Sequence, residues 1–87
     1  MTKVSSEKDV FGNIRWYKEG TDILHRENGP AVEFANGTKA WYQNGKYHRT
    51  DGPAIEYVDG NKYYYLNNKY CPDIKTDEDW LIFQIIN

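Results

Sequence analysis

Histidine, arginine and an acid or amide recur together in this chain, and these residue types can bind anions or transfer protons. The heptad His-Arg-Glu-Asn-Gly-Pro-Ala at residues 25–31 returns as His-Arg-Thr-Asp-Gly-Pro-Ala at residues 48–54. An imidazole titrates near neutral pH, and a guanidinium holds a phosphate or carboxylate with paired hydrogen bonds. Two such segments could therefore bind phosphates or the carboxylates of a partner.

The heptads belong to a longer repeat. Gly-x-x-x-Trp-Tyr precedes each of them, at residues 12–17 and 37–42, and a third copy at residues 60–65 lacks its heptad and runs on to Tyr70-Cys71-Pro72. The period is roughly 23–25 residues. Repeats mainly build extended surfaces, which favours a binding protein over an enzyme.

A structural interpretation of the heptad competes with the chemical one, and we favour it. Histidine would stack on the tryptophan of the opposite strand, and arginine would pair with an acid such as Glu33 or Glu56. Asn-Gly or Asp-Gly would make the turn, and proline would begin the next strand. The residues that rebuild each unit are then Trp16, His25, Gly29, Pro30, Trp41, His48, Gly52, Pro53 and Tyr64.

Size and composition indicate a single domain over residues 1–87. The net charge of −2 gives no basic footprint, which disfavours non-specific binding of nucleic acid. One cysteine cannot form an intramolecular disulfide, and no stretch approaches the ~18 apolar residues of a membrane span. We expect a cytoplasmic protein that does not enter membranes.

Turn dipeptides predict a mainly β fold, an antiparallel β-meander of two and a half hairpin repeats. Asn36-Gly37, Asn44-Gly45 and Asp59-Gly60 are hairpin signals, with Asn67-Asn68 a weaker one. The first strand is expected to begin near residue 10. Repeat 1 covers about 11–35, repeat 2 about 36–58 and a partial repeat 3 about 59–71.

These turns also predict the register. Two-residue loops over Asn36-Gly37 and Asp59-Gly60 would place Val32 opposite Trp41 and Ile55 opposite Tyr64. The remaining turns would place Trp41 opposite His48, Tyr64 opposite Cys71 and, with a four-residue loop at 19–22, Trp16 opposite His25. The face that carries the tryptophans, Val32 and Ile55 would be the core.

The last segment predicts one short helix over about 77–86. Thr76 can act as its N-cap, and Asp77, Glu78 and Asp79 suit the positive end of a helix dipole. The helix is apolar almost all round, so we expect it to be buried across the core face or against a second chain, which makes a homodimer plausible.

Catalytic and metal chemistry find little support. Cys71 occupies the place of the missing third histidine, so it indicates a decayed repeat position rather than a nucleophile. His25 and His48 lack a third ligand at suitable spacing, and the acids near residue 77 are explained by the helix start. We predict a non-enzyme with no catalytic residue, metal or cofactor.

The candidate binding surface combines aromatic and basic side chains. Exposed tyrosines could contact a partner or stack on bases, with lysines near the turns, although cross-strand aromatic pairing in a sheet is the simpler explanation. The residues chosen for this surface are Tyr42, Tyr47, Tyr63, Tyr65, Arg26 and Arg49.

The motif Trp-Tyr-x-Asn-Gly-Lys-x-His-Arg-x-Asp-Gly-Pro-Ala, present almost entire at residues 41–54, resembles a β-hairpin repeat of small proteins of tailed bacteriophages and giant viruses. It is loosely similar to MORN repeats. The likeness covers about residues 11–71 and carries no common catalytic residue. It implies a phage accessory protein in the host cytoplasm that binds and inhibits a host protein, such as a CRISPR effector, a restriction enzyme or a toxin. A sponge for a nucleotide or RNA that uses His/Arg pairs and tyrosines is the alternative, and a structural virion or assembly module is another.

Overall fold

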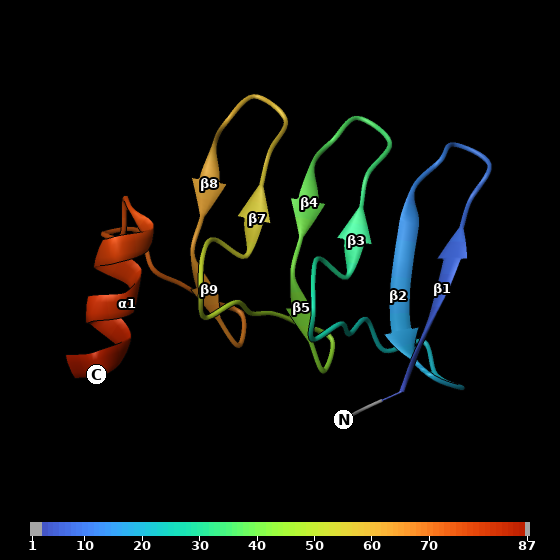
Figure 1. Ribbon diagram of the computed structural model, residues 1–87, viewed down its shortest axis with the longest axis horizontal. Coiled ribbons are helices and arrows are strands. Elements are labelled where there is room, and N and C mark those ends of the chain that lie inside the picture. The colour runs from blue at the N-terminus through green and yellow to red at the C-terminus, as the bar shows by residue number, and fades with distance from the viewer. Residues whose placement is uncertain (1–2, 87) are drawn as a thin grey trace.

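Short antiparallel strands stand side by side along the chain's long axis in the computed structural model, which describes residues 3–86, and a helix closes one end (Figure 1). The principal extents are 39 × 30 × 17 Å, so the molecule is a thin slab. The mainly β, antiparallel architecture with a single C-terminal helix confirms the prediction. The elements are β1 (Val4–Lys8), β2 (Ile14–Lys18), β3 (Val32–Glu33), β4 (Lys39–Ala40), β5 (Tyr42–Gln43), β6 (Lys46–Tyr47), β7 (Ile55–Glu56), β8 (Lys62–Tyr63), β9 (Tyr65–Leu66), β10 (Lys69–Tyr70) and α1 (Asp77–Ile86).

Three similar hairpins, β1–β2, β3–β4 and β7–β8, form one six-stranded sheet in that order. Each tip is a three-residue loop that ends in a glycine with positive φ: Gly12 at 90°, Gly37 at 98° and Gly60 at 95°. Residues with a side chain rarely adopt this backbone conformation. Glycine at each tip therefore fixes the hairpin geometry in all three copies.

Two smaller hairpins, β5–β6 and β9–β10, extend from the opposite end of the units. Their turns, Asn44-Gly45 and Asn67-Asn68, have positive φ at both central residues, as predicted for type I′ turns. The histidine register of the second unit is confirmed, since the backbone N–H of His48 donates to the carbonyl of Trp41 over 3.1 Å. In the same way, the backbone N–H of His25 donates to the carbonyl of Trp16, and that of Cys71 donates to the carbonyl of Tyr64.

The predicted register across the large hairpins is wrong by one residue. Val32 pairs with Ala40 rather than Trp41, and Ile55 pairs with Tyr63 rather than Tyr64. The cause is the loop length, because Phe34 and Tyr57 close three-residue loops where the dipeptides suggested two. A slip of one residue moves a strand's side chains to the other face of a sheet.

The corrected register separates apolar and charged positions in β3, β4, β7 and β8, whereas β2 places Arg15 opposite Val32 and Ile14 opposite Glu33. One face carries Val32, Ala40, Ile55 and Tyr63 in adjacent cross-strand positions. The other face carries Glu33, Lys39, Glu56 and Lys62 in the same sequence of strands, so that acid and base alternate. Opposite charges in cross-strand positions stabilise a sheet by about 0.2–1 kcal/mol per pair.

Strand β1 was not predicted from the sequence. It pairs along its whole length with β2, from Val4 opposite Lys18 to Lys8 opposite Ile14. Its side chains beyond Val4 are exposed, so its sequence carries no apolar alternation. The first unit therefore begins earlier than the predicted boundary near residue 11.

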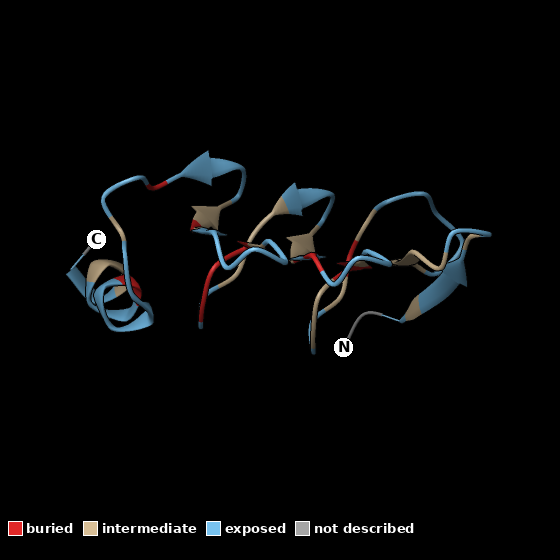
Figure 2. Cartoon of the chain, turned by 90° about the horizontal axis from the view of Figure 1, so that it is seen from above, coloured by how far each residue is buried: buried red, intermediate tan, exposed pale blue. Residues whose placement is uncertain are grey.

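Helix α1 has the predicted limits and the predicted cap, since the N–H of Asp79 donates to the Thr76 hydroxyl over 3.1 Å. Burial across the core face is wrong for most of its residues, since Trp80 is fully buried but Ile85 is 81% and Ile86 74% exposed in the single chain. Burial against a second chain stays a prediction. The helix covers the end of the array rather than the sheet face, so only one side of it meets the strands (Figure 2). Within residues 3–86, the structure has no helix of the length and apolar character needed to cross a bilayer.

Candidate functional site

The second heptad holds its arginine between an aromatic ring and a glycine. The Cζ atom of Arg49 lies 3.8 Å from the centroid of the Trp41 ring. On its other side a Cβ placed on Gly52 would lie 2.8 Å from that Cζ, which is closer than van der Waals contact. Glycine three residues after the arginine leaves the space in which the stacked guanidinium lies, and a Cβ there would require the guanidinium to shift.

The first heptad repeats this arrangement. Arg26 lies over the Trp16 ring with 4.2 Å between Cζ and centroid, and a Cβ on Gly29 would lie 3.0 Å from the same atom. A guanidinium over an indole contributes about 0.5–1 kcal/mol when exposed and about 2 when desolvated. Sequence reasoning missed this contact, although the shared Arg-x-x-Gly spacing and the Trp before each heptad carry it.

Hydrogen bonds satisfy donors of both arginines, and nearby acids balance their charge. Arg49 donates through Nη1 to the carbonyl of Pro53 and to Glu56, each over 3.2 Å, and through Nε to Asp51 over 2.8 Å. Arg26 likewise donates to the carbonyl of Pro30 over 3.2 Å and lies 3.8 Å from Glu33. The predicted pairing of the arginines with Glu33 and Glu56 is confirmed.

The heptad histidines join one unit to the next. Nδ1 of His25 accepts the backbone N–H of Asn44 over 2.9 Å, and Nδ1 of His48 accepts that of Asn67 over 3.2 Å. Both asparagines stand at the first central position of a type I′ turn in the following unit. Partial burial lowers the pKa of His48, which favours the neutral ring that can accept this bond.

These contacts support the structural interpretation of the heptads. The histidine and the arginine of each heptad meet a partner in their own unit or the next, and corresponding partners recur in both copies. The residues predicted to rebuild the units lie at these joints. Because the histidine and the arginine already bond within the chain, the heptad has few donors left for a diffusible anion.

The predicted tyrosines do gather on one face, and two more join them. Consecutive ring centroids lie between 4.6 and 5.8 Å apart, so the rings form an unbroken chain of contacts. We call this surface the tyrosine face. Its members, in order of contact, are Tyr42, Tyr47, Tyr65, Tyr70, Tyr63 and Tyr57.

A shallow hollow of about 240 Å³ adjoins the tyrosine face. Tyr47 and Tyr57 line it from the face, and Phe34 from the neighbouring hairpin. Phe34 and Tyr57 remain 40% and 45% exposed. The hollow therefore offers aromatic edges to a partner around an apolar floor made by Ala40 and Ile55.

Two hydroxyls of the tyrosine face have raised pKa values. Burial raises the pKa of Tyr42, with the hydroxyl of Tyr47 as a second cause. Burial also raises the pKa of Tyr65. These hydroxyls stay protonated, so the face presents neutral donors and acceptors on aromatic rings.

The predicted combination of tyrosines with Arg26 and Arg49 does not form one surface. Tyr63 shares its side of the sheet with Ile55, whereas Arg49 bonds to Glu56, which points to the other side. One ligand could not use the arginines and the tyrosines together. This separation weakens the idea of a nucleotide sponge that would need both.

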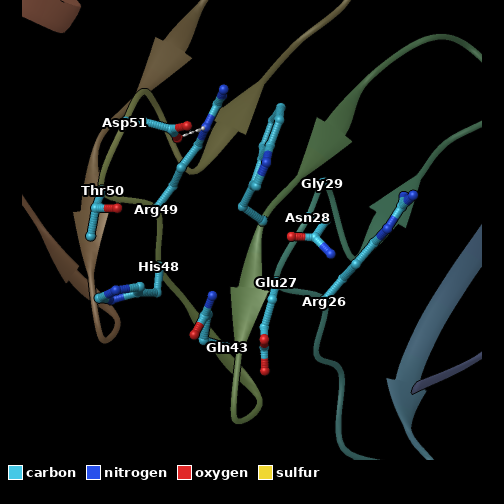
Figure 3. A pocket seen from close by; sticks show the side chains of 10 residues that line it. Arg26, Glu27, Asn28, Gly29, Gln43, His48, Arg49, Thr50 and Asp51 are labelled. Carbon is cyan, nitrogen blue, oxygen red and sulfur yellow. Dashed lines mark hydrogen bonds and ion pairs between the residues drawn. The ribbon is translucent and has the colours of Figure 1, made fainter. Parts of the chain in front are cut away.

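A second concave site lies on the arginine side, between the two heptad loops (Figure 3). We call it the inter-heptad groove. Its volume is about 580 Å³. The groove is lined by Arg26, Glu27, Asn28, Gly29, Trp41, Gln43, His48, Arg49, Thr50 and Asp51.

Within residues 3–86, histidines, cysteine and acids form no cluster of three or more that could hold a metal ion. Cys71 is buried beside Tyr64 and Trp80, and its thiol lies 3.7 Å from the carbonyl of Lys69. The chain matches no protein-family model, and comparison with curated proteins and with solved structures finds no match.

Proposed function

We propose that this protein is a non-enzymatic binding module that docks a protein partner on its tyrosine face. The observation that carries the proposal is the unbroken chain of tyrosine rings beside the hollow lined by Phe34 and Tyr57. Tyrosine and phenylalanine are enriched at protein interfaces, where rigid rings bury a large area at small entropic cost.

The thin slab supports this use of the face. A molecule of 39 × 30 × 17 Å presents a broad surface to a partner, and on the opposite side of the sheet Lys39 and Lys62 flank Glu56. The resemblance of the repeat to small phage proteins suggests the setting, in which the partner is a host protein that the complex inhibits. The partner's identity and the inhibition are part of the proposal.

The test compares capture of partners by variants of the two faces. Tyr57→Ser with Tyr70→Ser removes two rings that are each 45% exposed and so should leave the fold intact. Lys39→Ser with Lys62→Ser makes the same number of changes at exposed positions of the charged face. Each tagged protein is incubated with bacterial lysate, and the bound material is quantified by mass spectrometry and by absorbance at 260 and 280 nm.

We expect one protein, in stoichiometric amount, to bind the original protein and the lysine variant but not the tyrosine variant. Thermal melting of all three proteins checks that the fold is retained. Capture that survives the loss of Tyr57 and Tyr70 would contradict the proposal. Bound material with a nucleic-acid spectrum would favour the RNA or nucleotide sponge instead.

A further inference from the structure

The groove that follows the second heptad is filled by the chain's own helix. Trp80 is fully buried there, its ring centroid lies 5.5 Å from that of Tyr64, and its indole N–H donates to the carbonyl of Arg49 over 2.8 Å. Gln84 adds a bond of 2.7 Å to the carbonyl of Thr50. An aromatic ring and two side-chain amide or indole donors thus occupy the space between the second heptad loop and the third unit.

The inter-heptad groove is the counterpart of this filled groove, one period earlier in the chain. Tyr64 corresponds to Trp41, and the two carbonyls that accept from the helix correspond to those of Arg26 and Glu27. The residues packed around Trp80 also have counterparts that line the open groove. Leu66, Cys71 and Ile74 of the filled groove correspond to Gln43, His48 and Asp51 of the open one.

We infer that the inter-heptad groove binds a free purine base or nucleoside in the position that the Trp80 indole takes in the filled groove. A purine is a planar bicyclic ring of indole size, and it carries N–H or amino donors at its edge for the loop carbonyls. A volume of about 580 Å³ suits a small ligand. Trp41 provides a larger aromatic contact than the Tyr64 it replaces, and the Trp80 ring meets Tyr64 at a tilt of 54°, an arrangement that a purine could repeat against the indole.

The change in lining explains why the open groove does not take an apolar side chain. Three apolar residues of the filled groove become an amide, an imidazole and a carboxylate, which favour a ring with polar edges over a hydrocarbon. The Gln43 amide can donate to and accept from the edge of a purine in a paired arrangement. The groove therefore selects a heterocycle.

The charges of the groove favour an uncharged ligand. Arg49 is paired with Asp51 and Glu56, and Arg26 lies near Glu33. These acids leave no net positive charge for a phosphate group. A base or nucleoside should thus bind at least as well as the corresponding nucleotide.

The experiment is a titration of the full ¹⁵N-labelled chain with adenosine, guanosine, AMP, inorganic phosphate and N-acetyltryptophanamide, followed by NMR. A nucleoside is expected to shift the indole N–H of Trp41 and the side-chain amide of Gln43, while Tyr57 and Tyr70 on the tyrosine face stay unshifted. Because the two surfaces lie on opposite sides of the sheet, this site can fail while the proposed protein-binding face stands, and the reverse.

The main variant is Gln43→Leu, which installs the residue that the repeat already accepts at Leu66. Loss of paired hydrogen bonds should weaken nucleoside binding about tenfold or more. Asn28→Ala, on the opposite exposed wall, is a second variant in case the first does not fold. Ser6→Leu introduces the same apolar side chain on the exposed strand β1 and should leave binding unchanged.

Each outcome decides the inference. Binding of a nucleoside that Gln43→Leu or Asn28→Ala weakens and Ser6→Leu does not supports it. Absence of shifts up to the solubility of both nucleosides overturns it. Binding of phosphate or AMP without the nucleosides would identify an anion site, and binding of N-acetyltryptophanamide alone would identify a docking site for a partner's tryptophan; both overturn the assignment to a purine.

Discussion

Arginine rather than lysine fits the space between Trp41 and Gly52 because a guanidinium is flat on both sides. The same group donates in its own plane to Pro53 and Glu56 while its faces contact the ring and the glycine. An ammonium group is a compact point charge that cannot do both. The identity of this residue therefore follows from shape as much as from charge.

Replacing Arg49 by lysine should lower the free energy of unfolding by about 1–2 kcal/mol, the order of a desolvated cation–π contact with its hydrogen bonds. Urea unfolding followed by tryptophan fluorescence measures the change. Arg15→Lys is the control, since the Arg15 side chain is 35% exposed against 21% for Arg49, and surface pairs such as Arg15–Asp9 contribute about 0–1 kcal/mol. Equal, small effects at both positions would show that stacking at Arg49 is unimportant.

The His48 ring should make stability depend on pH. Burial lowers its pKa in the folded state below the ordinary value of 6.5, so the unfolded chain binds the proton more readily. Stability that this residue contributes is complete above about pH 6.5 and falls as the pH drops below it. Protonation also removes the acceptor for the Asn67 N–H.

Thermal melting between about pH 7.5 and 5 measures this dependence, and NMR titration of the His48 ring gives its pKa directly. His48→Asn supplies a side-chain oxygen in place of Nδ1 and does not titrate. The fall in melting temperature with acid should be smaller in this variant than in the original chain. A pKa at or above the ordinary histidine value would contradict the prediction.

Much of the residue-level chemistry was predictable, and one part was not. Glu33 and Glu56 were expected as the arginine partners because they follow each heptad at the same distance. The stacking of arginine on tryptophan brings together residues that lie 8 to 10 positions apart in one unit, the tryptophan before the heptad and the arginine within it. The close approach uses the space left by the missing Cβ at Gly29 and Gly52. A repeat pattern states which residues recur but not which of them touch.

At the level of the elements, the hairpin tips show how well a turn dipeptide predicts the length of a loop. Asn44-Gly45 makes the two-residue turn that it suggests, whereas Asn36-Gly37 belongs to a three-residue loop whose glycine alone has positive φ. The dipeptide is compatible with both geometries, and the strands on either side decide. The one-residue error exchanged the faces of Val32 and Ile55 and so separated them from the predicted tyrosines, whose face they share.

Strand β1 could have been inferred from Gly12. That glycine ends a hairpin tip as Gly37 and Gly60 do, and a tip needs a strand before it as well as after it. The exposed side chains of β1 gave no apolar alternation to support the inference. Repeat geometry was here a stronger signal than hydrophobic pattern.

Trp80 is the main attachment of α1 to the array. Trp80→Ala should lower the free energy of unfolding by about 3–5 kcal/mol, because a fully buried indole leaves both a cavity and an unpaired carbonyl. Trp80→Phe keeps a ring on Tyr64 and should have a smaller effect. Chemical unfolding of both variants gives the values.

The control for this prediction is Leu81→Ala, since Leu81 neighbours Trp80 in the helix but is 51% exposed. It should change stability by much less. If Trp80→Ala and Leu81→Ala cost the same, the helix would not be held by the indole. Added indole should raise the melting temperature of Trp80→Ala if the emptied groove keeps its shape.

The whole molecule carries an apolar stripe at its helical end. Leu81, Ile82, Ile85 and Ile86 are between 50% and 81% exposed, and their spacing places them along one side of α1. Exposed apolar patches of this kind mark contact surfaces. We expect the chain to associate reversibly with a second copy through this stripe.

Sedimentation velocity or light scattering across a concentration series measures the association. Ile85→Glu should shift the equilibrium to the monomer. Val10→Glu is the matched control, because Val10 is 93% exposed at the tip of the first hairpin, away from α1. A dimer that persists in Ile85→Glu but not in Val10→Glu would place the contact at the other end.

The hydrogen bond between each heptad histidine and the turn of the next unit affects how the repeat array can lengthen by duplication of its coding sequence. Because the joint between units 1 and 2 is made by the same atoms as the joint between units 2 and 3, a duplicated block of 23 codons would supply both halves of a new joint. The helix would still close the last unit. Slippage or unequal recombination within the coding sequence would then yield longer versions that fold, and each inserted unit would add another groove.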